Sequence, residues 1–101
     1  MLRFERDPAK ARANRRKHGV TFEVARKVFE DPFAYFEPDH AATGEIRWKA
    51  IGLVGGLVLL LVVHTVREKD GDEIIRLISA RRATRKERQR YGEAGSEDAY
   101  R

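Results

Sequence analysis

The chain has 101 residues, of which 21 are lysine or arginine and 16 are aspartate or glutamate, and its formal net charge is +5 with a pI near 9.9. This length suits one domain with a modest core, and the positive charge favours anionic partners such as nucleic acid, an acidic protein or an anionic membrane surface. The absence of cysteine excludes a disulfide framework and a thiolate zinc site, and it fits a reducing, cytoplasmic location.

The first elements predicted along the chain are a short strand and a basic helix. Residues 2–6 alternate apolar and charged side chains, as a half-exposed strand does. Asp7 and Pro8 are typical of an N-cap and of a first helical position, so we expect a helix over residues 9–18. Gly19 should end this helix, which carries alanines and cations rather than large apolar side chains.

A second helix and two strands are predicted in the middle of the chain. Thr21 is a suitable N-cap, and apolar residues follow at helical spacing as far as Asp31, which precedes a proline and should end the helix. Residues 33–36 suit a short strand and residues 37–44 a loop. Residues 45–53 begin with alternating polar and apolar side chains, become wholly apolar, and predict a further strand.

Two tight turns are predicted to connect the strands that follow. The Gly-Gly pair at residues 55–56 can form a two-residue hairpin turn into an apolar strand over residues 57–65. The Asp-Gly pair at residues 70–71 tolerates positive φ angles and predicts a second hairpin. Residues 74–82 are therefore expected to form an antiparallel strand.

A basic helix is predicted after this strand. Thr84 and Glu87 match the capping box, in which the threonine accepts from the Glu87 backbone N–H and the glutamate bonds back. The helix should reach Tyr91. Residues 92–98 are small and acidic and predict a flexible acidic tail over residues 92–101, so that residues 1–91 form the single domain.

The predicted order of elements is β-α-α-β-β-β-β-α, which indicates an α+β fold. Short turns make the strands from residue 33 onward antiparallel. We therefore expect an antiparallel sheet with two N-terminal helices and one C-terminal helix on one of its faces. The N-terminus lacks the apolar core of a signal peptide, and the apolar residues 51–63 are too few to span a membrane as a helix.

Two stretches of the sequence resemble the signatures of a known family. They read Phe4-x-x-Asp7-Pro8-x-Lys10-x-x-x-Asn14-x-x-Lys17-His18-Gly19-Val20-x-Phe22 and Ile78-Ser79-Ala80-Arg81-x-Ala83-x-x-x-Glu87-Arg88-x-x-Tyr91. Both are similar to the opening and closing signatures of the BrnT family, and the resemblance spans residues 2–91. It implies a RelE-like fold and a bacterial type II toxin that blocks translation by cutting RNA. It also implies a partner antitoxin, BrnA, and allows a toxin–antitoxin heterotetramer.

Metal-free RNA cleavage uses the 2′-hydroxyl as the nucleophile and needs no cofactor. The site must remove the hydroxyl proton, stabilise negative charge on the phosphorane and protonate the departing 5′-oxygen. Arg81, at a strand end beside a helix start, is the best candidate for phosphate contact because a guanidinium can bond two oxygens. Arg76 and Arg81 would point to opposite faces of a regular strand, so both could line one face only through a twist or bulge.

Two groups of residues suit proton transfer at the phosphate or contact with the RNA backbone. The candidate catalytic residues are Arg81, Arg88, Tyr91, His64, His18 and Lys17. The candidate RNA-binding residues are Lys10, Arg12, Arg15, Arg16, Arg76, Arg82 and Arg85. We expect the surroundings of His18 and the segment 81–91 to edge one shared positively charged hollow.

Each candidate also has a structural interpretation. His18 would complement the end of the first helix, and His64 would be a hydrogen-bonded residue at a strand end. Glu87 would be only the capping partner of Thr84, and Tyr91 would pack on the sheet. Asn14 is expected to bond the neighbouring loop, and Asp39, His40 and Glu45 give only a weak metal signal.

Two other classes of function remain open from the sequence. A non-catalytic nucleic-acid-binding module would bind RNA or DNA with a steep salt dependence and would cut neither. A protein-interaction domain would dock an acidic partner on its basic face and bind RNA weakly. RNA cleavage by the purified chain separates both classes from a ribonuclease.

Overall fold

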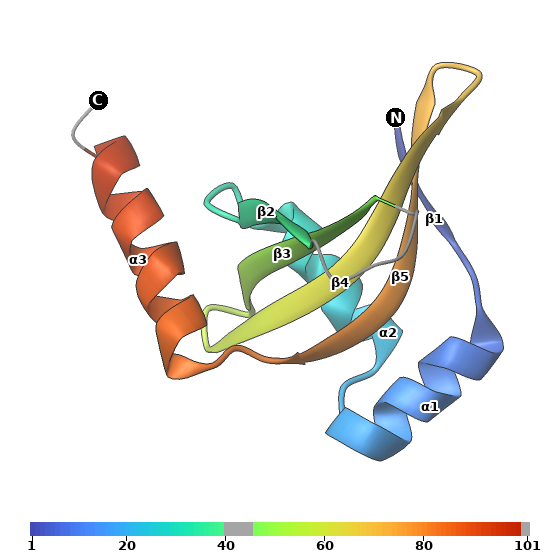
Figure 1. Cartoon of the computed structure of the whole chain (residues 1–101), viewed down its shortest axis with the longest axis horizontal. Coiled ribbons are helices and arrows are strands. Elements are labelled where there is room, and N and C mark those ends of the chain that lie inside the picture. Colours follow the sequence, from blue (N-terminus) through green and yellow to red (C-terminus); the bar gives the residue numbers. More distant parts are fainter. Residues whose placement is uncertain (40–45, 100–101) are drawn as a thin grey trace.

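The computed structural model describes the backbone of residues 1–39 and 46–99, and side chains in these ranges as far as residue 94. Along the described chain the elements are β1 (Leu2–Glu5), α1 (Pro8–His18), α2 (Phe22–Ala25), the 3₁₀ helix η1 (Arg26–Glu30), β2 (Tyr35–Asp39), β3 (Arg47–Val54), β4 (Val58–Lys69), β5 (Asp72–Arg82) and α3 (Arg85–Ala99). The predicted order of strands and helices is confirmed (Figure 1).

The helix ends follow from local side-chain chemistry. The Asp7 carboxylate accepts from the Lys10 backbone N–H at 3.1 Å, and Gly19 ends α1 with a φ of 71°. Thr21 accepts from the Val24 N–H at 3.2 Å and caps α2. The second predicted helix is present but tightens into η1 after one turn, before Asp31 leaves the helical region.

Both predicted hairpins form. Asp70 and Gly71 have φ angles of 53° and 83°, as the turn between β4 and β5 requires. The loop between β3 and β4 has three residues rather than the predicted two, because Val54 pairs with Val58. Strand β4 continues past residue 65, where the sequence predicted its end, and reaches Lys69.

The sheet has the strand order β1-β5-β4-β3-β2 in the described part of the chain. The three pairings β2–β3, β3–β4 and β4–β5 are antiparallel, as predicted. Strand β1, however, pairs in parallel with β5, so the sheet is mixed and the expectation of a wholly antiparallel sheet is wrong. After β1 the chain passes through α1 and α2 and re-enters the sheet at the opposite edge, in β2. Because no tight turn joins β1 to β5, the two strands can run parallel.

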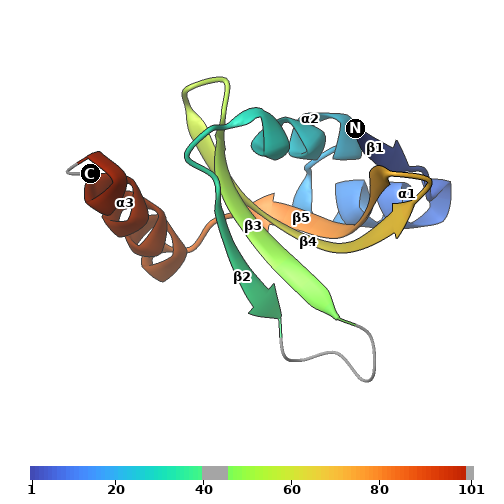
Figure 2. The ribbon, with the colours of Figure 1, turned by 90° about the horizontal axis from the view of Figure 1, so that it is seen from above.

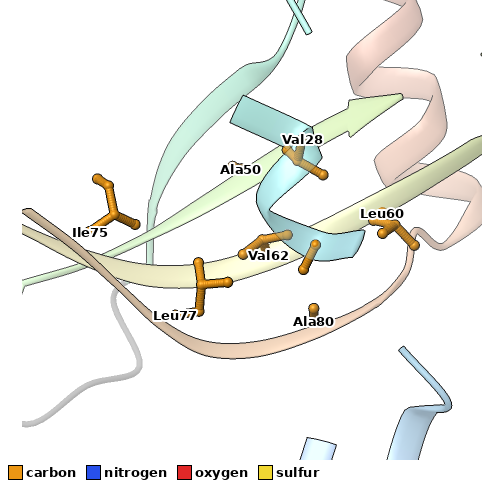
Figure 3. Close-up of a cluster of buried hydrophobic side chains, with 8 residues drawn as sticks. Val28, Ala50, Leu60, Val62, Ile75, Leu77 and Ala80 are labelled. Carbon is orange, nitrogen blue, oxygen red and sulfur yellow. The ribbon is translucent and has the colours of Figure 1, made fainter. Parts of the chain in front are cut away.

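The main core lies between the sheet and the segment from α2 to η1. Val28 of η1 lies over Ala50 and Val62, with Leu77 beside them (Figure 3). At Gly52, a β-carbon would come within 2.7 Å of a Val28 methyl group. Only glycine therefore allows η1 to approach β3 this closely.

Helix α3 lies on the other side of the sheet from α1 and α2 (Figure 2). The expectation that all helices share one face is therefore wrong. The reason lies in β3 and β4, which are apolar on both faces: the paired residues Ile51 and Leu61 are 0% and 1% exposed and point away from the core around Val28. Helix α3, which contacts β3 and β2, packs on that side.

Helix α3 also extends beyond Tyr91 to Ala99, through residues that the sequence predicted to be a loose tail. The segment 92–99 is helical, whereas the domain boundary at residue 91 and the mobility of the tail stay predictions, and residues 100–101 lie outside the described range. Over the described residues, no helix is long and apolar enough to cross a membrane.

Asn14 connects α1 to the uncovered edge of β5. Its side-chain amide donates to the carbonyls of Val20 and Ala80 at 2.9 and 2.8 Å, and its oxygen accepts from the Ala80 N–H at 2.9 Å. β1 pairs with β5 only as far as Arg76, so Asn14 supplies the bonds that a neighbouring strand would make at Ala80. The predicted bond to the loop is confirmed, and the bond to β5 is additional.

We expect Asn14→Ala to lower the free energy of unfolding by about 2–4 kcal/mol, because it leaves buried backbone groups of Ala80 without partners. Urea denaturation measures the change, and Arg12→Ala, an exposed change on the same helix, is the matched control. A loss below about 1 kcal/mol would show that water replaces the amide.

Candidate active site on the polar sheet face

A bulge in β5 decides which cations share a face. The register between β4 and β5 shifts between Val63 and His64: Val63 pairs with Ser79 and His64 pairs with Leu77, which leaves Ile78 as the extra residue. Because a bulge reverses the alternation of the residues beyond it, Arg76 and Arg81 point to the same face despite their odd separation. This face is the one away from α1 and α2.

The strand register extends this face across the sheet. Ser79 is followed across the strands by Val63, Lys49 and Glu37, which are cross-strand neighbours in that order. Side chains that face each other in this way lie within interaction distance. We call this surface, which carries Glu37, Lys49, Arg76, Ser79 and Arg81, the polar face.

Arg47 adds a further cation to the same face. It lies two residues before Lys49 on β3 and pairs across the strands with Asp39. Its Nε atom is buried and has no hydrogen-bond partner among the described residues. Lys49 likewise has no ion-pair partner in the part of the chain that the structure describes. Both side chains therefore have donors available for an anion.

Arg81 is held by α3. Its two terminal nitrogens donate to the two carboxylate oxygens of Glu87 at 2.8 and 3.0 Å, and one of them also donates to the Arg82 carbonyl at 3.2 Å. The Thr84 N–H donates to Glu87 at 2.8 Å and the Glu87 N–H to the Thr84 hydroxyl at 3.3 Å, which confirms the capping box. Glu87 thus caps α3 and neutralises Arg81 at once.

The charge state of this pair follows from its contacts. Burial would raise the pKa of Glu87, but the bonds from Arg81 and from the Thr84 N–H outweigh it and lower the pKa to about 2. The bond to Glu87 raises the pKa of Arg81. Three of the five guanidinium donors of Arg81 are engaged, so the residue at the edge of the polar face has two left for a phosphate.

Two more contacts fix α3 against the sheet. Arg90 donates to Glu37 at 2.9 Å, and the Tyr91 hydroxyl donates to Asp31 at 2.6 Å. Burial and the neighbouring Asp31 carboxylate raise the pKa of Tyr91 to about 12, so the phenol keeps its proton at neutral pH. Asp31 also accepts from the Leu53 N–H at 2.8 Å, which ties β3 into the same cluster.

His64 lies inside the fold rather than at a strand end. Its side chain is 1% exposed, and its ring packs edge-on against Phe29 with centroids 4.9 Å apart. Burial lowers its pKa, although a contact of 3.2 Å between Nδ1 and the Val62 carbonyl opposes the shift. Its cross-strand partner Leu77 belongs to the core, on the face opposite the polar face. His64 has no direct contact with solvent through which to meet RNA.

The residues of α1 lie on the other side of the molecule from α3. His18 lines a cleft with Arg82, whereas Arg81 points to the polar face and pairs with Glu87. The expectation that His18 and the segment 81–91 edge one shared hollow therefore holds for Arg82 and is wrong for Arg81 and Tyr91, which bond Glu87 and Asp31 instead. The cause is strand alternation, which sends the adjacent Arg81 and Arg82 to opposite faces.

The remaining candidate residues are all exposed at the surface. Arg12, Arg15 and Arg16 line a shallow hollow on α1. The others are Lys10 and Lys17 on α1 and Arg85 and Arg88 on α3.

Lys49, Glu37 and Arg47 were not among the candidates predicted from the sequence. Their signal is weak, because three polar side chains at alternating positions of two strands are equally typical of a solvated sheet face. Once the register is known, Glu37 and Lys49 fall in the same cross-strand row as Ser79, with Val63 between Lys49 and Ser79. Among residues 1–39 and 46–94, no three histidine or carboxylate side chains are grouped so as to hold a metal ion. Of the weak metal candidates, His40 and Glu45 lie outside the described residues.

The polar face combines groups of the kinds that phosphodiester cleavage requires. Guanidinium and ammonium groups can bind a phosphate and stabilise added negative charge on it. The neighbouring Glu37 carboxylate is a proton acceptor, and the Lys49 ammonium is a proton donor. The arrangement can therefore support acid–base chemistry on a bound phosphate.

Comparisons with known proteins agree on one family. The family model described as "Ribonuclease toxin, BrnT, of type II toxin-antitoxin system" matches residues 7–87. The crystal structure of the Brucella abortus ribonuclease toxin BrnT is similar to this chain, with a TM-score of 0.59 and 26% sequence identity over 83% of this chain and 96% of that one. A search of curated proteins returns no match.

Proposed function

The chain belongs to the BrnT family of ribonuclease toxins of type II toxin–antitoxin systems, and on this premise we propose that it cuts RNA on the polar face without a metal ion. The observation that carries the proposal is the bulge at Ile78, which brings Arg76 and Arg81 to one face. The same register places Ser79 in a row with Lys49 and Glu37.

We assign roles from the chemistry of each group. Arg76 and Arg47 bind the scissile phosphate and stabilise the phosphorane, with Arg81 at the edge of the site. Glu37 accepts the proton of the attacking 2′-hydroxyl, and Lys49 protonates the departing 5′-oxygen. The ion pair with Arg90 holds the Glu37 carboxylate in place.

Candidates outside the polar face take other roles in this proposal. Tyr91 and Glu87 position α3 and, through it, Arg81 and Glu37. His64 stabilises the aromatic cluster under the sheet. The exposed cations of α1, near residues 10–17, attract the RNA backbone without contacting the scissile bond.

The biological role follows from the family. We propose that the chain acts in the bacterial cytoplasm, where loss of messenger RNA stops translation, and that an antitoxin of the BrnA kind holds it inactive in a heterotetramer. The relation of the fold to RelE-like ribonucleases belongs to the same proposal.

The chemistry is tested with the purified chain and an RNA oligonucleotide. We expect cleavage in excess EDTA, and we expect a 2′-deoxy substitution at the mapped cleavage site to abolish it, because the nucleophile is then missing. Gel electrophoresis measures both. Loss of cleavage in EDTA that magnesium restores would contradict the metal-free mechanism, and cleavage of the 2′-deoxy substrate would contradict attack by the 2′-hydroxyl.

A further inference from the structure

A second hollow lies on the opposite side of the sheet from the polar face. It is a cleft of about 550 Å³ between the chain that links α1 to α2 and the β3–β4 hairpin. Its volume falls within the range of sites that bind a ligand or a few side chains of a partner. The floor and walls are formed by five aliphatic side chains, Val20, Val24, Val54, Val58 and Leu60.

This cleft continues the hydrophobic core, but its apolar side chains are only partly covered. Val20, Val54 and Val58 pack against the core and remain only half-buried. Val24 is 40% exposed at the rim, and Leu57, next to Val58 at the tip of the hairpin, is 87% exposed. Contiguous apolar surface of this kind marks a place where another molecule binds.

The rim of the cleft is positively charged. His18 and Arg82 both line it, and none of its described lining residues is acidic. The last turn of α1 adds Arg15, Arg16 and Lys17 at the same end of the helix. An occupant would therefore gain from apolar side chains that enter the cleft and from carboxylates placed at its rim.

The lining favours a protein segment over RNA. Proteins bind single-stranded RNA by stacking bases on aromatic side chains, and no aromatic side chain lines this cleft in the described residues. Aliphatic floors instead accept the apolar face of an amphipathic helix. We propose that this cleft binds an amphipathic, acidic segment of the antitoxin, an inference that rests on the proposed function for the existence of that partner.

The test compares two matched valines. Val24 and Val66 are 40% and 39% exposed, and Val66 lies on β4 several residues away from the cleft lining. We expect Val24→Asp to weaken binding of the separately purified antitoxin at least 10-fold, because the new carboxylate meets an apolar floor and acidic partner residues. Val66→Asp should bind as the wild type does. Calorimetry measures the affinity, and thermal melts confirm that both variants fold.

RNA cleavage by each free variant is measured in parallel. Cleavage by Val24→Asp at the wild-type rate that the antitoxin no longer inhibits, with Val66→Asp still inhibited, supports the proposal. Equal antitoxin affinity of the two variants overturns it. A loss of RNA affinity, or the dissociation of a homodimer, in Val24→Asp would also overturn it and would make RNA or a second copy the occupant. Failure of the wild-type chain to cut RNA counts against the proposed function instead, because the binding comparison does not depend on cleavage.

Discussion

Lys49→Ala is expected to reduce RNA cleavage by about 100–1000-fold, the effect of removing one group that meets developing charge in a transition state. Lys49 adjoins Glu37 on the polar face and has no ion-pair partner among the described residues, so its removal leaves no buried charge behind. The melting temperature should therefore change little. Single-turnover cleavage of an oligonucleotide and a thermal melt of the same sample measure the two effects.

Lys17→Ala is the matched control for this prediction. It removes the same charge from the exposed end of α1, on the other side of the sheet, and should change cleavage less than about 3-fold at moderate salt. A large loss of cleavage rate in Lys17→Ala together with a small loss in Lys49→Ala would indicate that the active site lies at α1 instead. Equal small losses in both would show that neither lysine meets the reacting phosphate.

The local elements of this fold could be predicted from the sequence because their signals are local. Asp7, Thr21 and Thr84 each cap a helix within three residues of their own position. The Asp-Gly turn at residues 70–71 needs only the backbone freedom of its own two residues. Such signals do not depend on where the rest of the chain lies, so the order of elements was correct.

The layout of the sheet could not be predicted in the same way. Strand β5 carries apolar residues at both alternations, Ile75 and Leu77 before the bulge and Ala80 after it, so no pattern marks Ile78 as the extra residue. The bulge is fixed by pairing with Val63 and His64 of β4, which lie more than ten residues before Ile78 in the sequence. The parallel pairing of β1 with β5 is likewise determined by contacts between distant parts of the chain. The same holds for the side of the sheet that α3 covers.

The candidate site could be predicted only in part, because its geometry also depends on the pairing of the strands. Arg81 lies beside the start of a helix, as predicted, but strand alternation alone shows neither that it shares a face with Arg76 nor that it bonds Glu87. His64 looked like a strand end because the polar residues after it resembled a loop, whereas β4 continues to Lys69. No local signal marks Lys49, because its neighbours on the polar face come from other strands.

Glu87→Gln is expected to lower the free energy of unfolding by about 2–3 kcal/mol at pH 7 and to flatten its dependence on acid. The folded pKa of Glu87 is about 2, below its ordinary value of 4.5, so the stabilisation is complete above pH 4.5 and is lost as the pH falls toward 2. A shift of this size corresponds to about 3 kcal/mol, reduced somewhat because the Arg81 side chain is 36% exposed. Urea denaturation at pH 7, 4.5 and 3 measures the effect.

The comparison of Glu87→Gln with Arg81→Met separates the two roles of the ion pair. If Arg81 serves only to hold α3, both variants lose stability and both cut RNA normally at temperatures where they are folded. If the free donors of Arg81 also contact phosphate, Arg81→Met alone loses cleavage, whereas Glu87→Gln, which releases the guanidinium from its counter-charge, retains it. A Glu87→Gln variant whose stability falls with acid as steeply as the wild type would show that another carboxylate, such as Asp31, controls the acid response.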